Sequence, residues 1–285
     1  RVFLELDQLY KKLQVPAKER LAGFEKYAIG ADGREALIEK RDDLMIEYVT
    51  LLNTCGRYRD ALDAILGHVF RPWEGAEGKV SAQYKVALTQ LAKEKLKDSD
   101  YAAAKELLEK ALALPLNLGE GRLEGTKDNH IWYLLGTALE AMEGLDGAKG
   151  CYERATEGTD EPAGMMYYYD QPADMILYKG RAFDKLGEHR RACACFHKLV
   201  DYGERHLRDQ MRMDYFAVSL PDFSIWEDDL TGRNEAHCYY LMGLGHLGLL
   251  EKEEARRYLL ETLQRDPSHQ NAILYLQETF RARAR

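Results

Sequence analysis

Residues 132–139, Trp-Tyr-Leu-Leu-Gly-Thr-Ala-Leu, together with residues 148–155, Ala-Lys-Gly-Cys-Tyr-Glu-Arg-Ala, decide the fold of this 285-residue chain. Apolar and small residues recur at helical spacing in both stretches, which predicts two amphipathic helices. Gly136 and Ala148 let the two helices approach closely, while Tyr152 fills the space around the contact. One hairpin cannot bury this face alone, so the pattern predicts stacked neighbours.

The same pattern recurs along the chain. Gly180 is followed by Ala192 and Phe196, and Gly243 is followed by Ala255. Weaker copies lie upstream, where the crossing position of the first helix is not a glycine. The second-helix alanines fall at positions 61, 104, 148, 192 and 255, in steps of 43, 44, 44 and 63.

The spacing of Trp132, Leu135, Gly136, Leu139, Ala148 and Tyr152 resembles the tetratricopeptide repeat (TPR), whose usual period is about 34 residues. The resemblance implies an all-α protein, a right-handed α-solenoid of about five TPR-like hairpins with extended inter-repeat loops and a C-terminal capping helix. In that family the first helix of each hairpin lines a concave groove.

The expected organisation is an N-terminal pair of helices followed by the array. We expect these segments: helices packing on the array in residues 1–36, hairpins near 37–70, 79–115, 128–157, 172–203 and 235–266, an insertion at 201–234, and a capping helix at 268–283. Because the chain begins at Arg1 inside a helical pattern, we expect it to be part of a longer polypeptide.

Composition argues against several classes of protein. The net charge of −8 is spread over mixed acidic and basic residues without a basic patch, so we expect no nucleic-acid partner. No run approaches 18 apolar residues, so we expect no membrane insertion. The five cysteines lack a C-x-x-C motif, which predicts reduced, buried thiols in a cytoplasmic protein.

No motif for catalysis, metal or cofactor emerges. The sequence lacks H-E-x-x-H and G-x-S-x-G, and Gly75-x-x-Gly78-Lys79 has the wrong spacing for a phosphate loop. Carboxylates such as Glu74 and Glu77 match a glycosidase by residue type alone. We therefore predict a non-catalytic protein without cofactors.

The groove is the expected binding site for a peptide or protein, including a preceding domain of the same chain. Aromatic faces and an arginine suit such a partner, although each residue could simply face water. The family's geometry places these residues toward solvent: His130, Tyr133, Thr137, Glu140, Asp174, Leu177, Arg181, Asp184, His237 and Tyr240.

Three aromatic loops depart from the repeat. The stretches at 72–79 and 214–222 resemble the C-terminal TPR region of large bacterial proteins of unknown function, whose preceding part resembles β-sandwich, carbohydrate-handling enzymes. The alternative function is therefore an accessory module that stacks loop aromatics on glycans, and the competing interpretation is simple loop packing. The candidate loop residues are Trp73, Glu74, Tyr168, Asp170, Tyr215, Asp222 and Trp226.

Overall fold

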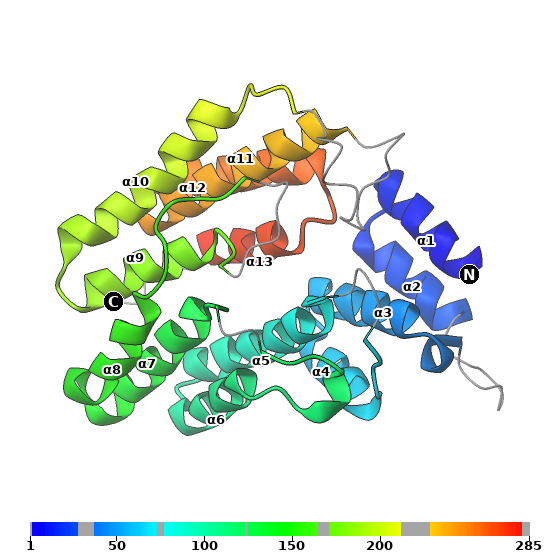
Figure 1. Cartoon of the computed structure of the whole chain (residues 1–285), viewed down its shortest axis with the longest axis horizontal. Helices are drawn as coiled ribbons and strands as arrows, with labels where there is room; N and C mark the ends of the chain where they lie inside the picture. Colours follow the sequence, from blue (N-terminus) through cyan, green and yellow to red (C-terminus); the bar gives the residue numbers. More distant parts are fainter. Residues whose placement is uncertain are drawn as a thin grey trace. The chain divides into compact units, whose positions relative to one another are not determined.

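The computed structural model describes residues 2–27, 37–72, 77–122, 125–164, 171–211 and 229–280. All regular structure in these residues is helical (Figure 1). The chain forms two compact units, residues 1–122 and 123–285, each of which is described by itself. No helix among the described residues combines the length and the apolar character that crossing a bilayer requires.

Unit 1 begins with two helices and continues with two helical hairpins. Its elements are α1 (Val2–Lys12), α2 (Ala17–Tyr27), η1 (Leu37–Lys40), α3 (Asp42–Thr54), α4 (Tyr58–Gly67), α5 (Lys79–Lys97), α6 (Tyr101–Leu112) and η2 (Leu116–Leu118). Helices α3 to α6 pack in series, and α3 also contacts α5.

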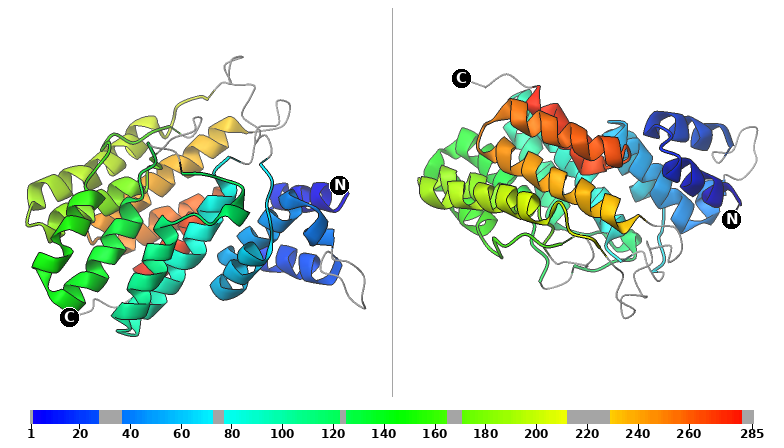
Figure 2. Two further views of the ribbon diagram at one scale, coloured as in Figure 1. Left: turned by 60° about the horizontal axis from the view of Figure 1, so that its bottom comes forward. Right: turned by 90° about the horizontal axis from the view of Figure 1, so that it is seen from above.

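Unit 2 consists of three hairpins and a final helix. Its elements are α7 (Asn129–Glu143), α8 (Leu145–Ala155), α9 (Met175–Lys185), α10 (His189–His206), α11 (Leu230–Gly248), α12 (Lys252–Arg265) and α13 (Gln270–Thr279). Helices α10, α11 and α12 run side by side (Figures 1 and 2). The first helices also contact one another in the order α7, α9, α11, α13.

The three hairpins of unit 2 share one register. A Cβ on Gly136 would lie 2.7 Å from the Tyr152 ring, sixteen residues further on. The missing side chain therefore makes room for a large one on the second helix. The same spacing and the same close approach recur in the pairs Gly180–Phe196 and Gly243–Leu259.

The two hairpins of unit 1 have the same sixteen-residue spacing between contacting residues, but a larger residue stands in place of the glycine. The equivalent pairs are Val49 with Ile65 and Ala92 with Leu108, and all four residues are fully buried. The second-helix alanines at 61, 104, 148, 192 and 255 are buried in both units. The alanine pattern read from the sequence therefore marks the inner face of every second helix.

The turns inside the hairpins all need a left-handed backbone. Gly56, Gly144 and Gly187 have φ values of 80°, 82° and 79°. Ser99 and Leu250 occupy the equivalent turns with φ values of 60° and 65°. A side chain in this region costs conformational energy, so these two turns hold local strain.

Two asparagines cover the carbonyl ends of second helices in unit 2. The Asn129 side-chain amide donates to the carbonyl oxygens of Ala155 and Glu157, at 2.7 and 2.9 Å. The Asn234 amide donates to the carbonyl oxygen of His206 at 2.8 Å. Helix ends leave such carbonyls without intrahelical partners. The Asn129 amide therefore joins the start of α7 to the end of α8 within one hairpin, whereas the Asn234 amide joins α11 to the end of α10 in the hairpin before it.

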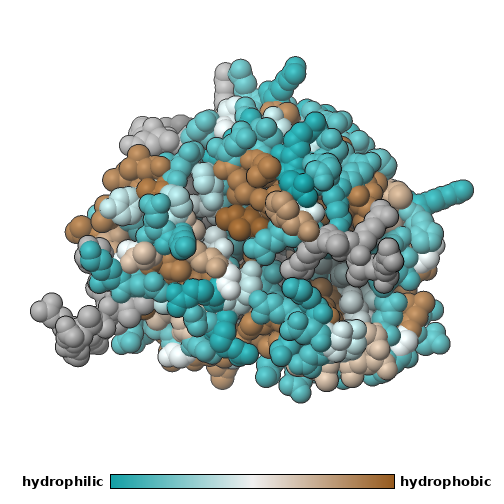
Figure 3. All heavy atoms as spheres, turned by 180° about the vertical axis from the view of Figure 1, so that it is seen from behind, coloured by the Kyte–Doolittle hydropathy of each residue, from teal (hydrophilic) through white to brown (hydrophobic). Residues whose placement is uncertain are grey.

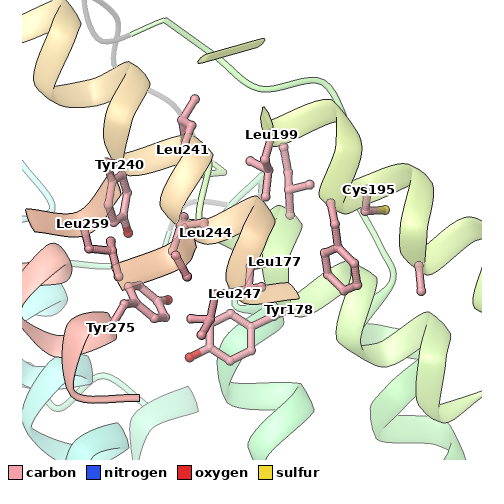
Figure 4. Packing of buried hydrophobic residues seen from close by; sticks show 14 of the residues in the cluster. Leu177, Tyr178, Cys195, Leu199, Tyr240, Leu241, Leu244, Leu247, Leu259 and Tyr275 are labelled. Atoms are coloured by element: carbon pink, nitrogen blue, oxygen red, sulfur yellow. The ribbon is translucent and has the colours of Figure 1, made fainter. Parts of the chain in front are cut away.

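The core of unit 2 gathers side chains from α9, α10, α11, α12 and α13 (Figure 4). Helices α10 and α11 approach closely because each supplies a glycine. A Cβ on Gly203 would lie 2.6 Å from the carbonyl oxygen of Cys238, and one on Gly245 would lie 2.7 Å from that of Phe196. Backbone cannot move aside as a side chain can, so both positions require glycine.

The five thiols are free but differ in exposure. Cys195 and Cys238 are buried, Cys55 and Cys151 are partly buried, and Cys193 is exposed. The prediction of buried thiols is therefore wrong for Cys193. Residues two apart on a helix point to different sides, so Cys195 packs inward while Cys193 faces out.

Candidate functional site

Four tyrosines from four helices form a continuous row in unit 2. The Tyr178 ring centroid on α9 lies 5.8 Å from that of Tyr133 on α7 and 6.4 Å from that of Tyr275 on α13. Tyr275 lies 6.2 Å from Tyr240 on α11. Figure 4 shows the rings of Tyr178, Tyr275 and Tyr240. We call these four residues the tyrosine row.

The row lies on the side formed by the first helices α7, α9 and α11, which we call the first-helix face. Tyr178, Tyr240 and Tyr275 are buried there. Burial raises the pKa of Tyr240 and that of Tyr275 well above the ordinary value for a phenol. Both hydroxyls therefore stay protonated and can donate hydrogen bonds.

Helix α13 reaches the first-helix face through two polar contacts. The Tyr275 hydroxyl donates to Oδ2 of Asp174 at 3.2 Å. Arg181 Nη2 donates to Oε2 of Glu278 at 2.9 Å, and only 21% and 15% of the two side chains are exposed. The Arg181 guanidinium also lies 5.4 Å from the centroid of the Tyr178 ring.

Both ends of α13 are fixed by other side chains. Nδ1 of His269 accepts from the backbone amide of Ala272 at 3.1 Å and caps the helix. The His269 ring lies 4.6 Å from the Tyr240 ring, and burial lowers the pKa of this histidine. At the other end, Arg256 Nη2 donates to the carbonyl oxygen of Thr279 at 3.1 Å.

The part of the first-helix face on α7 and the end of α9 is more open. Lys185 Nζ and the Tyr152 hydroxyl both donate to Oε2 of Glu140, at 2.7 and 2.5 Å. Burial opposes ionisation of Glu140, but these two donors prevail and lower its pKa. About a third of the Lys185 and Glu140 side chains is exposed, at 35% and 31%. This charged pair can meet a partner.

The structure corrects three of the predicted solvent-facing positions. Asp174, Leu177 and Tyr240 are buried, at 8%, 0% and 5% exposure. The prediction that they face solvent is wrong because α13 and the core of unit 2 cover them. Their role in binding stays a prediction.

The other groove residues are accessible to different degrees. His130, Tyr133, Thr137 and Glu140 on α7 are half-buried. Arg181 on α9 and His237 on α11 are half-buried as well. Asp184 is exposed and its Oδ1 lies 2.6 Å from Nδ1 of His189. His237 lies apart from the ion pair, with Nε2 at 2.9 Å from the carbonyl oxygen of Ala163, and burial lowers its pKa.

Sequence reasoning missed the two central members of the tyrosine row. Tyr178 lies next to the predicted Leu177, so its pattern was that of an ordinary core residue. Tyr275 was assigned only to a capping helix. A carboxylate three residues after Tyr275, at Glu278, is the signal that could have indicated a contact surface on one side of that helix.

The predicted loop residues lie outside the described part of the chain. They are Trp73, Glu74, Tyr168, Asp170, Tyr215, Asp222 and Trp226. The glycan-binding alternative, which rests on these residues, stays a prediction.

A second surface feature of unit 2 is a shallow, open hollow of about 440 Å³ over α10, α11 and α12. Tyr239 and Tyr258 stack at 6.1 Å, and the Arg265 guanidinium lies 4.3 Å from the centroid of the Tyr239 ring. None of the binding residues predicted from the sequence lines this hollow. Its lining residues are Glu204, Leu207, Arg208, Tyr239, Met242 and Tyr258.

Other surfaces carry apolar side chains as well. Figure 3 shows apolar residues gathered in patches among hydrophilic ones. In unit 1, α1 exposes Val2, Leu6 and Leu9 on one side, while Phe3 packs edge-on against Phe24 of α2. Among the described residues, no three histidine, cysteine or acidic side chains gather as a metal site.

Comparison with known proteins found solved structures to which the chain is similar at low sequence identity. No protein-family model matches it. It resembles the APC/C hetero-tetramer Cut9–Hcn1 at 14% identity and a TM-score of 0.38, covering 98% of this chain and 42% of that chain. It resembles TTC0263, a thermophilic TPR protein of Thermus thermophilus, at 17% identity and a TM-score of 0.35, covering 84% and 98%.

A third similar structure is YrrB, described as a TPR protein with an unusual peptide-binding site. The identity is 16% and the TM-score 0.28, with 93% of this chain and 99% of that chain covered. The described residues are all-α, and the chain is similar to these TPR structures.

Proposed function

We propose that this chain is a non-catalytic interaction module that binds a helical segment of a protein on the first-helix face of unit 2. One observation carries the proposal: this face already holds a helix, α13, through the ring of Tyr275 and the carboxylate of Glu278. The partner segment belongs to another protein or to another part of the same polypeptide.

The chemistry of the face suits a helix with both apolar and charged side chains. Tyr178 and Tyr240 already contact the Tyr275 ring of α13, and such large rings lose little conformational entropy on contact with a helix. Arg181 offers a planar guanidinium that can pair with a carboxylate. Tyrosine and arginine are enriched among the residues that carry most of the energy at protein interfaces.

The open end of the face adds a polar element. Lys185 and Glu140 form an ion pair beside Tyr133. Charged side chains of a partner helix can pair with Lys185 or Glu140 in place of this ion pair. Such charge pairing contributes more to the choice of partner than to affinity. This supports a helix-in-groove mode of recognition, with anchors about one turn apart.

The test is a selection of helical peptides on the immobilised full chain. Selected peptides are then titrated by calorimetry against the wild type and against Lys185→Ala. We expect the substitution to weaken binding by about 3- to 30-fold, because a charged contact at the open end is lost. Hydrogen exchange should show protection of α7 and α9 in the complex.

Lys198→Ala is the matched control. Lys198 has the same exposed fraction as Lys185, 35%, and pairs with Asp160 on another surface. Peptides that bind equally well to the wild type and to Lys185→Ala, without protection of α7 or α9, would contradict the proposal.

A further inference from the structure

Helix α13 is the last helix that the structure describes, and it occupies the position of a first helix. No second helix follows it among the described residues. Helix α13 packs on α12 and contacts α11, as α9 and α11 each do with the two helices of the hairpin before them. It also reaches back to α9 through Tyr275 and Glu278. These two residues, which make its polar and aromatic contacts with α9, lie about one helical turn apart.

The surface beneath α13 has the features of a recognition site. Asp174 and Arg181 stand in an otherwise aromatic and aliphatic surface. Each one meets a complementary group of α13: a hydroxyl for the carboxylate and a carboxylate for the guanidinium. Charged groups of this kind specify a partner's register but add little net stability over an apolar contact.

Helix α13 is short and adds few apolar side chains to the core. It spans 10 residues, and isolated helices shorter than about 12 residues are marginal in water. Ala272, Leu274 and Tyr275 supply its buried apolar side chains. Most of the unit 2 core comes from α9, α10, α11 and α12, including Leu177, Leu199 and Leu244, so a competing helix with the same anchors leaves most of this core in place.

We propose that α13 is the resident occupant of a helix-binding site, and that the partner for this site is an amphipathic helix carrying a tyrosine and, three residues later, a carboxylate. This inference rests on the proposed function and names its partner class. In the free protein α13 covers the Tyr178, Tyr240, Asp174 and Arg181 side chains. The partner displaces it and repeats its contacts.

The short covalent link between α12 and α13 explains why α13 occupies the site in the free protein. A segment linked to its site by a few residues competes at an effective concentration in the millimolar range. Only the residues from Asp266 to His269 separate α12 from α13. A short free peptide should therefore bind the wild-type chain poorly, and weakening the contact of α13 should open the site.

The experiment uses the full chain and a fluorescent peptide with the sequence of residues 268–280, followed by fluorescence anisotropy. We expect the Glu278→Arg chain, which keeps Arg181, to bind this peptide at least about tenfold tighter than the wild type does. A second peptide carrying Glu278→Arg should prefer the Arg181→Glu chain by a similar factor. The chain with both substitutions should bind neither peptide, because its own α13 fits again.

Lys198→Glu is the control and should behave like the wild type. Circular dichroism melts establish that each variant is folded before it is titrated. Because both Glu278→Arg and Arg181→Glu should release α13 from the site, the test remains possible if one of the two variants does not fold. Equal affinities of both peptides for folded Glu278→Arg and Arg181→Glu chains, or no binding to either, would overturn the inference. If selected helices still depend on Lys185 in that case, the proposed function stands without it.

Discussion

Arg181 Nη2 and Glu278 Oε2 lie 2.9 Å apart although 97 residues separate them in the sequence. The pair connects α9 to α13 across the first-helix face, and both side chains are mostly buried. Its energetic weight can be measured against an exposed pair in the same unit.

A double-mutant cycle on Arg181 and Glu278 should give a coupling energy of about 1–2 kcal/mol, because the surroundings screen this pair less than water would. The control cycle is Arg257 with Glu254, whose side chains are 58% and 44% exposed. That pair should give less than about 0.5 kcal/mol. Urea denaturation of the full chain provides both values, and equal couplings would contradict the burial of the first pair.

Gly180→Ala should destabilise unit 2 by about 1–3 kcal/mol through overpacking. Its Cβ would lie 2.3 Å from the Phe196 ring, and that ring cannot retreat because Gly248 makes a similar close approach to it on the other helix. Gly150→Ala is the control, since a Cβ there meets nothing within 4 Å.

The control substitution lies on an exposed part of α8 and should stabilise by about 0.5–1 kcal/mol, because alanine favours a helix over glycine. Thermal melts of the two variants should therefore shift in opposite directions. A shift in the same direction would show that the register of the hairpin is not as described.

Leu250→Gly should stabilise the chain by up to about 1 kcal/mol, because it relieves a left-handed backbone that leucine disfavours. Leu250 has φ of 65° and is exposed, so little apolar contact is lost. The reciprocal change, Gly187→Ala at φ of 79°, should destabilise by about 1 kcal/mol. Chemical denaturation should show a higher free energy of unfolding for Leu250→Gly and a lower one for Gly187→Ala than for the wild type.

Acidification should destabilise unit 2 through two half-buried histidines. Burial lowers the pKa of His237 and of His269 below the ordinary 6.5, so the unfolded chain binds more protons than the folded one below that pH. Stability therefore falls as the pH drops from 6.5 toward the folded pKa values. At His269, protonation also removes the Nδ1 acceptor that caps α13.

His269→Asn isolates this contribution, because asparagine can still cap the helix but does not titrate. The slope of unfolding free energy against pH below 6.5 should be smaller in this variant than in the wild type. An unchanged slope in His269→Asn would show that this histidine does not govern the acid sensitivity.

Cysteine labelling should proceed at two distinct rates at pH 8. Burial raises the pKa of Cys195 to about 11 and that of Cys238 to about 12. Both thiols therefore stay protonated at this pH, and the reagent cannot reach them. Cys193 is exposed and should react with iodoacetamide first. Mass spectrometry of partially labelled protein orders the sites, and early modification of Cys238 would contradict its burial.

The sequence by itself determined the hairpins and their register. Gly136, Gly180 and Gly243, each followed at fixed spacing by an alanine and a large side chain, encode contacts between helices that are neighbours along the chain. Such contacts leave a periodic signal, because the same steric requirement recurs in each hairpin. The tetratricopeptide-like pattern therefore predicted the all-α class and the inner faces of the second helices.

Only the tertiary structure decided what covers the first-helix face. The contacts of Tyr275 with Asp174 and of Glu278 with Arg181 join segments about 100 residues apart, with separations of 101 and 97 residues. No local period encodes such a meeting, because it depends on how the hairpins between α9 and α13 stack. The positions predicted to face solvent at Asp174, Leu177 and Tyr240 became buried for that reason.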